Sequence, residues 1–276
     1  MKKVFTTLTS CLIAGSFVSA YADQPIESVA VKKSVKHHKV HHKTHKTVVM
    51  KDQVAKDQAP AKKDDGLWWM DNLTGNLTWV SNYIFRGISQ TRNLPAIQGG
   101  LTYTFPIGIY ANMWGSNVKF AGTGASIEID GIVGYHKQIS DFIMDLSVAR
   151  YFYPGAHILN YNEFLSIFNY KFLQFSYNYS ADVFNVHQSG TYIQGGINYD
   201  IPSKYLFNME GVNITALTGH YSLPAAAGNT YNDYLVSVAK KLRNYTFSLI
   251  YTTTDGRQHA SPLGGTTYTA QLAANF

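Results

Sequence analysis

The sequence is poor in cysteine, in charge and in long apolar runs. It has one cysteine among 276 residues, and only 14% of the residues are charged. Beyond the N-terminus no uninterrupted apolar run reaches the roughly 18 residues of a transmembrane helix, which argues against a helical membrane protein. Barrel strands leave a weaker hydropathy signal, so this absence does not exclude the membrane. With 45% hydrophobic and 14% aromatic residues, the chain is too apolar for disorder.

A basic surface is also missing from the larger part of the chain. The formal net charge is +6, but residues 67–276 hold eleven Lys and Arg against eleven Asp and Glu. The excess comes from two N-terminal lysines and from ten lysines against six acids in residues 23–66. Because the main body is neutral, we expect no nucleic-acid partner.

The first 22 residues have the pattern of an export signal. A pair of lysines precedes an apolar stretch, and small residues at Ala20 and Ala22 give the A-x-A pattern of a cleavage site. We expect a signal peptide at residues 1–22 and a mature chain that starts near Asp23. Cys11 lies inside the apolar stretch, so cleavage would leave a mature chain without thiols.

Residues 23–66 have no aromatic residue and are rich in lysine and histidine. They cannot bury enough apolar surface to offset the entropy cost of ordering, so we expect a disordered periplasmic tail. In a helix, the histidines would have a spacing suited to Zn, Ni or Cu, although the lysines between them would repel a dication. These weak metal candidates are His37, His38, His41, His42 and His45. Alternatively, the tail could contact an anionic cell-wall polymer or lipid headgroups. We expect no cofactor.

The remaining residues, 67–276, alternate apolar or aromatic with small or polar residues. The clearest block is LQFSYNYSAD, from Leu173 to Asp182. A period of two predicts strands with one apolar and one polar face. We count twelve strands, and ten is the alternative because three of them alternate poorly. The predicted strands are 76–87, 95–105, 109–118, 126–137, 141–152, 161–171, 173–184, 190–200, 208–219, 231–240, 244–253 and 266–276.

Three features favour an all-β fold of one kind, a single-chain antiparallel transmembrane β-barrel, over a secreted β-sandwich. Long loops alternate with short turns, as in bacterial outer-membrane barrels. The last strand ends on Phe276, with Tyr268 on the same face, which resembles the C-terminal signal that the barrel-assembly machinery recognises. Aromatic residues gather near strand ends, as at Tyr151, Phe152 and Tyr153, where girdles in contact with outer-membrane lipid are expected.

Four motifs, in order along the chain, carry a family resemblance. They are YIFRGISQ (83–90), PAIQGGLTY (95–103), GIYANMWGSNV (108–118) and EIDGIVGY (128–135). Together they are similar to the TorF-type porins, the Gcw_chp family of proteobacterial outer-membrane proteins. The resemblance covers residues 73–276. It implies an outer-membrane β-barrel of porin type in a family whose substrate is not established.

The polar strand faces then predict a narrow channel. Twelve strands leave room for a small aqueous pore, whereas eight would be filled by side chains. Because acids outnumber basic residues in the inferred lining, we expect a weak cation preference or none. We predict passive diffusion of small hydrophilic solutes and no enzymatic activity. The inferred lining residues are Arg86, Glu128, Asp130, Asp145, Gln174, Asn178, Asp182, Gln194 and Asn198.

A plugged structural barrel is the main alternative. Such a barrel would anchor the basic tail to the periplasmic cell wall or present its loops to a partner. In it, Glu128 and Asp130 would pair with Arg86, because polar groups away from water need partners.

An outer-membrane esterase or lipase is a minor alternative. His187 with Ser189, and His220 with Ser222, stand two residues apart, so each pair would share a strand face. A histidine base beside a serine hydroxyl is the beginning of a nucleophilic site. The wider lipase motif is absent, so we give this function little weight.

Overall fold

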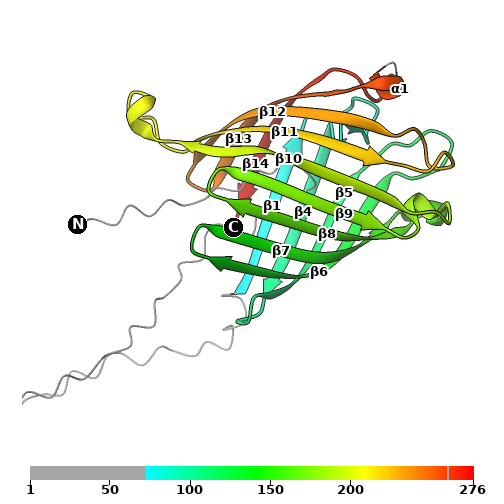
Figure 1. Cartoon of the computed structure of the whole chain (residues 1–276), viewed down its shortest axis with the longest axis horizontal. Helices are drawn as coiled ribbons and strands as arrows, with labels where there is room; N and C mark the ends of the chain where they lie inside the picture. The colour runs from blue at the N-terminus through cyan, green and yellow to red at the C-terminus, as the bar shows by residue number, and fades with distance from the viewer. Residues whose placement is uncertain (1–71, 260) are drawn as a thin grey trace, which may run out of the picture. The chain divides into compact units, whose positions relative to one another are not determined.

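The alternating blocks fold into strands that close on themselves. In the computed structural model, which describes residues 72–259 and 261–276, twelve antiparallel strands form a closed barrel (Figure 1). Two further strands of two residues each pair only with one another. The prediction of a twelve-stranded antiparallel barrel is confirmed. The signal peptide, the tail and its histidines lie outside the described residues.

Each wall strand pairs with its neighbours in the wall, and the first strand pairs with the last. The wall strands are β1 (Leu73–Val80), β4 (Ala96–Thr104), β5 (Ile109–Asn117), β6 (Ile127–Ile139), β7 (Phe142–Phe152), β8 (Tyr161–Tyr170), β9 (Leu173–Ser180), β10 (Gly190–Ile201), β11 (Val212–Ser222), β12 (Tyr231–Leu242), β13 (Tyr245–Thr254) and β14 (Thr267–Asn275). The other two strands are β2 (Ile84–Phe85) and β3 (Ile88–Ser89).

Short helical turns lie in the connections. They are α1 (Gly256–His259) and 3₁₀ turns at His157–Leu159, Val183–Asn185 and Ser203–Tyr205. Among the described residues, no helix is both long and apolar enough to cross a membrane.

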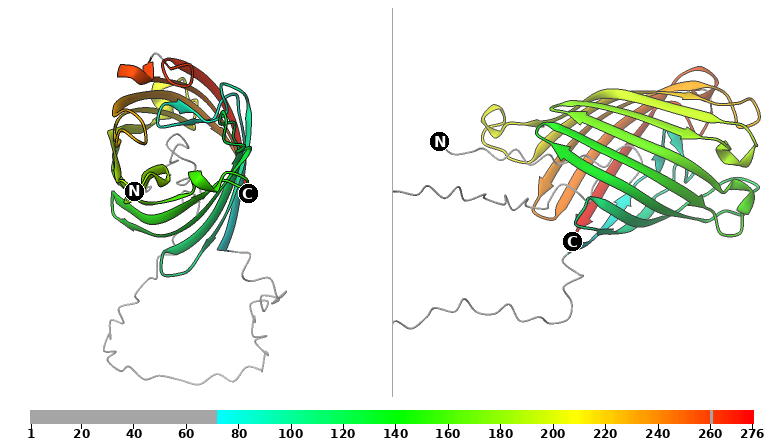
Figure 2. Two further views of the ribbon diagram at one scale, coloured as in Figure 1. Left: turned by 90° about the vertical axis from the view of Figure 1, so that its right-hand side faces the viewer. Right: turned by 60° about the horizontal axis from the view of Figure 1, so that its bottom comes forward.

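The two ends of the barrel differ in their connections (Figure 2). We call one the long-loop end, because the connections 81–95, 118–126, 153–160, 181–189, 223–230 and 255–266 emerge there. The short-turn end carries Leu73, Phe276 and the other connections, of which only 202–211 is long among the described residues. The predicted alternation of long loops and short turns is thus present with one exception.

Alternation also separates an outer face from an inner one. Outward side chains such as Leu101, Met113 and Val133 are more than half exposed. Inward neighbours along the same strands, such as Thr102, Trp114 and Ile132, are buried. The charged side chains at outward positions of the described strands are Lys137, Arg150 and Lys240, each near a strand end.

The first strand is shorter than the prediction of 76–87. Strand β1 ends at Val80, and residues 84–89 form the separate hairpin β2–β3. The alternation continues past Val80 because a hairpin, like a wall strand, has two faces. Arg86, which falls inside the predicted strand 76–87, therefore lies in the hairpin and not in the first wall strand.

The last residue closes the barrel at the short-turn end. The Gly75 N–H donates to the Phe276 carbonyl at 2.7 Å, and the Phe276 N–H donates to the Gly75 carbonyl at 2.9 Å. A Cβ at Gly75 would overlap the Phe276 ring as it lies here, so the ring occupies the space that the glycine leaves. Phe276 and Tyr268 are 70% and 78% exposed. Their role as an assembly signal stays a prediction.

Candidate functional site

Residues 81–95, which connect β1 to β4, fold into the long-loop end of the barrel. We call this segment the inner hairpin. Its strands β2 and β3 are joined by Arg86 and Gly87, whose φ angles are +49° and +77°. Two successive positive φ values are typical of a type I′ turn, whose twist suits a two-residue hairpin.

The inner hairpin contacts the barrel wall on both sides of β1, the strand from which it leaves. On one side the Tyr83 ring packs edge-on against Trp114 of β5, with 5.6 Å between ring centroids. On the other side a Cβ at Gly87 would overlap the methyl group of Thr254 in β13. These contacts hold the hairpin to β5 and β13, which are separated in the wall by β4, β1 and β14.

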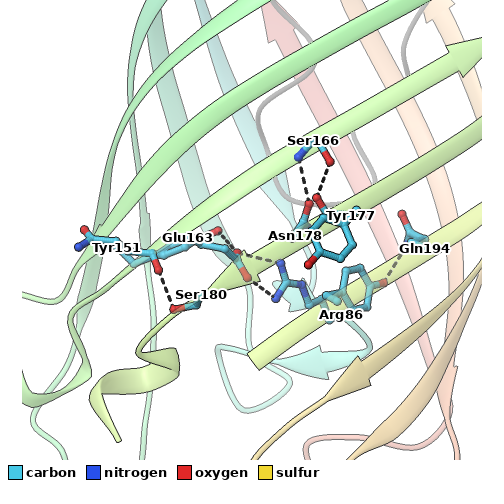
Figure 3. A network of polar contacts seen from close by, with 10 residues as sticks. Arg86, Tyr151, Glu163, Ser166, Tyr177, Asn178, Ser180 and Gln194 are labelled. Atoms are coloured by element: carbon cyan, nitrogen blue, oxygen red, sulfur yellow. Dashed lines mark hydrogen bonds and ion pairs between the residues drawn. The ribbon is translucent and has the colours of Figure 1, made fainter. Parts of the chain in front are cut away.

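At the tip of the inner hairpin, Arg86 forms a buried ion pair with Glu163 of β8 (Figure 3). The guanidinium donates from Nη1 and Nη2 to the two carboxylate oxygens at 2.9 and 2.8 Å. The two side chains are 5% and 1% exposed. The Tyr151 hydroxyl donates to the same carboxylate at 3.0 Å, and the Asn178 amide oxygen, in the orientation that satisfies its partners, accepts from Nη2 at 2.9 Å.

Aromatic rings surround the same guanidinium. Its central carbon lies 4.6, 4.4 and 4.6 Å from the ring centroids of Phe85, Tyr192 and Tyr221. The Tyr231 hydroxyl donates to the Arg86 carbonyl at 2.9 Å and so holds the tip from β12. Burial alone would lower the pKa of Arg86, but the Glu163 carboxylate outweighs it, and the pKa lies well above its ordinary value. The side chain is a permanent cation.

A second carboxylate borders the tip. The Tyr192 hydroxyl donates to Asp233 of β12, 3.0 and 3.2 Å from its two oxygens. A Cβ at Gly219 would overlap both the Tyr192 hydroxyl and the Asp233 carboxylate. The glycine in β11 thus leaves the space in which this tyrosine reaches its acid.

Two further acids lie on β6 at the same end. The Tyr153 hydroxyl donates to Glu128 at 2.8 Å, and Asp130 is 1% exposed. Burial first, and then the nearby Glu128 carboxylate, raise the pKa values of Tyr83 and Tyr153 well above the ordinary value. Both phenols therefore stay protonated as potential donors to the acids. Among the described residues, the acids that form ion pairs are Glu163, Asp145 and Asp182, and neither Glu128 nor Asp130 is one of them.

The interior at the short-turn end is built differently. Asn213 donates from its amide to Asn198 at 2.8 Å and to Asp200 at 2.9 Å. Tyr110 donates its hydroxyl to Asp145 at 2.8 Å. This half is lined mainly by amides and hydroxyls, such as Thr102 on β4.

Most of the predicted lining residues do lie on inward strand positions. They are Glu128, Asp130, Asp145, Gln174, Asn178, Gln194 and Asn198. That they line an open pore stays a prediction. Asp182 lies beyond the end of β9, in a loop, where its side chain accepts from the His187 N–H. The expected pairing of Glu128 and Asp130 with Arg86 is wrong, because Arg86 pairs with Glu163.

Two features of the site differ from what the sequence pattern predicts or cannot be read from it. The alternation of Tyr161, Glu163 and Leu165 with outward residues in β8 places Glu163 on the inner face but does not indicate its partner. The assignment of Tyr151 and Tyr153 to a lipid-facing girdle is wrong, because both are buried and hydrogen-bond to acids of the interior. Only Phe152 between them is exposed, at 36%.

The histidine–serine pairs lie away from this interior. His220 is on the outward face of β11, with its Nδ1 2.7 Å from the Asn232 amide oxygen. His187 lies in a loop, 86% exposed at its side chain and 3.4 Å from Asp182. Neither histidine hydrogen-bonds to its serine in the described part of the chain.

Comparisons with known proteins give one family and several barrels. The model of a family described as "Bacterial protein of unknown function (Gcw_chp)" matches residues 70–275. Among solved structures, the chain is similar to a KdgM porin, with 10% identity, 74% of this chain and 99% of that chain covered, and a TM-score of 0.49. A NanC porin is 12% identical, with 74% of this chain and 98% of that chain covered and a TM-score of 0.45. The outer membrane protein opdK from Pseudomonas aeruginosa is 12% identical, with 66% of this chain and 57% of that chain covered and a TM-score of 0.37. No curated protein matches the sequence.

Proposed function

Because the chain belongs to the Gcw_chp family of bacterial proteins of unknown function, we propose its activity from its structure: a narrow diffusion channel of the outer membrane. The observation that carries the proposal is the closed barrel, apolar outside and polar inside. A closed barrel satisfies every backbone hydrogen bond of its wall, so it can stand in lipid. The three charged outward residues lie near strand ends, where they reach the headgroups.

The direction of insertion follows from the connections. In barrels of this kind the long loops face the outside and the short turns face the periplasm. The tail of residues 23–66 would then enter the periplasm, where it could touch cell-wall polymer or anionic lipid. Phe276 and Tyr268 would serve as the signal to the barrel-assembly machinery.

The charge of the interior supports a preference for cations. Inward strand positions hold six carboxylates, and their charge is opposed by Lys241 on the wall and Arg86 on the inner hairpin. Acidic linings favour cations. We therefore propose small hydrophilic cations and neutral solutes as cargo. The six acids are Glu128, Asp130, Asp145, Glu163, Asp200 and Asp233.

One observation favours the second candidate, a plugged barrel that serves as an anchor. The inner hairpin crosses the long-loop end, and its tip is held by a buried ion pair. A hairpin that never leaves this place would narrow the passage at all times. The two functions differ in whether the protein conducts ions.

Conductance in a planar lipid bilayer separates them. We expect the purified chain to give small discrete current steps with a cation preference in a salt gradient. Glu128→Gln/Asp130→Asn should weaken that preference, whereas Asp141→Asn/Asp182→Asn, which removes two acids outside the interior, should not. A folded barrel that carries no current would overturn the channel and leave the anchor.

A further inference from the structure

The side-chain partners of Arg86 come mainly from the barrel wall. Glu163 lies on β8, Asn178 on β9, Tyr192 on β10 and Tyr221 on β11. We call these four residues the guanidinium cage. The inner hairpin itself adds only Phe85. The recognition groups therefore belong to a rigid wall, and Arg86 enters them from a separate segment.

The chemistry of the cage is specific for a planar cation. A carboxylate that takes two parallel hydrogen bonds fits a guanidinium fork, and aromatic faces attract its delocalised charge. Glu163 takes both hydrogen bonds, and the Tyr192 and Tyr221 rings lie 4.4 and 4.6 Å from the guanidinium carbon. An ammonium group would neutralise the charge of the carboxylate but could not donate the same two parallel hydrogen bonds.

Among the described residues, Arg86 is the cation that forms an ion pair with Glu163, and Arg150, which pairs with the neighbouring Asn162, points outward. Lys241, the lysine at an inward strand position, lies at the opposite, short-turn end of β12. Without Arg86, Glu163 would be a buried carboxylate with no opposite charge, which is strongly unfavourable. A cation from solution that reached the cage would remove this penalty.

We propose that the guanidinium cage binds a solute carrying a guanidinium group, and that Arg86 is the internal competitor for this site. The proposal rests on the channel function, since it names the class of solute that the long-loop end of the channel would select. Asp233 borders the tip of the inner hairpin and offers a second anionic position beside Tyr192. A solute with a guanidinium at one end and an ammonium at the other would offer one cation to each carboxylate.

The test measures binding without a membrane, by calorimetry on the purified protein in detergent with agmatine as the probe. Arg86 lowers the fraction of protein that can bind, so its removal should tighten the apparent Kd. We expect Arg86→Ala to bind agmatine at least about tenfold more tightly than the wild type. Arg92→Ala, which removes an exposed arginine of the same segment, should match the wild type.

Two further comparisons define the site. In the Arg86→Ala background, Glu163→Gln should weaken agmatine binding by about tenfold or more, whereas Asp145→Asn at the short-turn end should change it less than twofold. Putrescine, which replaces the guanidinium by an ammonium, should bind Arg86→Ala less tightly than agmatine. Equal binding of the two probes would overturn the guanidinium assignment. Binding to Arg86→Ala no tighter than to the wild type would overturn the site.

A measurement on the wild type covers the case in which Arg86→Ala does not fold. Saturating agmatine should speed hydrogen exchange of the amides at residues 84–89, because the solute displaces the tip, and equal ionic strength of KCl should not. Unchanged exchange would contradict the competition. Because no step depends on conduction, a silent bilayer with agmatine binding would refute the channel and leave the cage standing.

Discussion

Near the long loops, the interior of the barrel is built from rings and carboxylates, whereas near the short turns it is built from amides and hydroxyls. At the long-loop end, Arg86 is enclosed by Glu163 and three rings and is 5% exposed. At the short-turn end, Asn213 and Asn198 hydrogen-bond to each other along the wall. The first half has the composition of a protein core with a buried ion pair, and the second that of a surface facing water.

This difference has an energetic consequence. Groups in a packed core depend on one another, because a buried charge that loses its partner has no water to replace it. Amides and hydroxyls on a wall can exchange one partner for another at little cost. Equivalent substitutions in the two halves should therefore have unequal effects.

The largest effect is expected from the ion pair. Glu163→Leu leaves Arg86 charged and unpaired, so the free energy of unfolding should fall by about 3–5 kcal/mol. Asp145→Leu at the other end removes the acceptor of the Tyr110 hydroxyl and the carboxylate 3.4 Å from His136 Nδ1, and should cost about 1–2 kcal/mol. Denaturant unfolding in detergent, followed by tryptophan fluorescence, measures both.

A double variant checks the cause. Arg86→Met/Glu163→Leu removes both charges, so it should be more stable than Glu163→Leu alone, as expected for a buried pair replaced by apolar residues. If Glu163→Leu and Asp145→Leu cost the same, the two halves do not differ in the way proposed.

The next effect concerns the packing of the hairpin tip. Gly87 and Gly122 have similar positive φ angles, +77° and +75°, but a Cβ at Gly87 would overlap Thr254, whereas Gly122 has no neighbour within 4 Å. Alanine at either position costs about 1 kcal/mol from the backbone alone. Gly87→Ala should lower the free energy of unfolding by about 1–3 kcal/mol more than Gly122→Ala, because the added methyl group overlaps Thr254. Equal unfolding free energies for the two variants would mean that the tip is not packed against β13.

The wall of the barrel could be predicted from sequence, since period-two blocks such as Leu173–Asp182 give both the strand and its faces. The inner hairpin could not be separated from β1 by the same pattern, because alternation continues through Phe85. The signal in the sequence was Gly87, a residue common in hairpin turns, although arginine is not typical of the position before it.

The partners in the candidate site were harder to predict. Pairing of Arg86 with Glu163 joins residues 77 positions apart in the sequence. Local alternation shows that Glu163 lies on the inner face of its strand. It does not show that Glu163 and the tip of the inner hairpin lie at the same level along the barrel axis. The prediction for Tyr151 and Tyr153 was wrong for a related reason. An aromatic residue near a strand end is equally common in a lipid-facing girdle and in a packed barrel interior, so its position alone does not give its face.

A smaller effect is expected from the hydrogen bond that holds the tip. Tyr231→Phe removes the donor to the Arg86 carbonyl and should cost about 1 kcal/mol. Hydrogen exchange at residues 84–89 should be faster in this variant. Tyr234→Phe, on the outward face of the same strand, should leave that exchange unchanged. Faster exchange in both variants would point to a general loosening of β12.

The smallest effect concerns Asp255, where the chain leaves β13. The Asn232 backbone N–H and side-chain amide donate to its carboxylate at 2.7 and 2.6 Å and lower its pKa. A lowered pKa gives stability that is present above the unfolded value, about 3.9, and is lost as the pH falls through the folded value. Exchange of the Asn232 amide should therefore be steady from pH 8 to pH 5, after correction for intrinsic rates, and rise by less than about tenfold below pH 4. Asp255→Asn should abolish that rise. A rise that persists in this variant would assign the acid sensitivity to the buried carboxylates at the long-loop end instead.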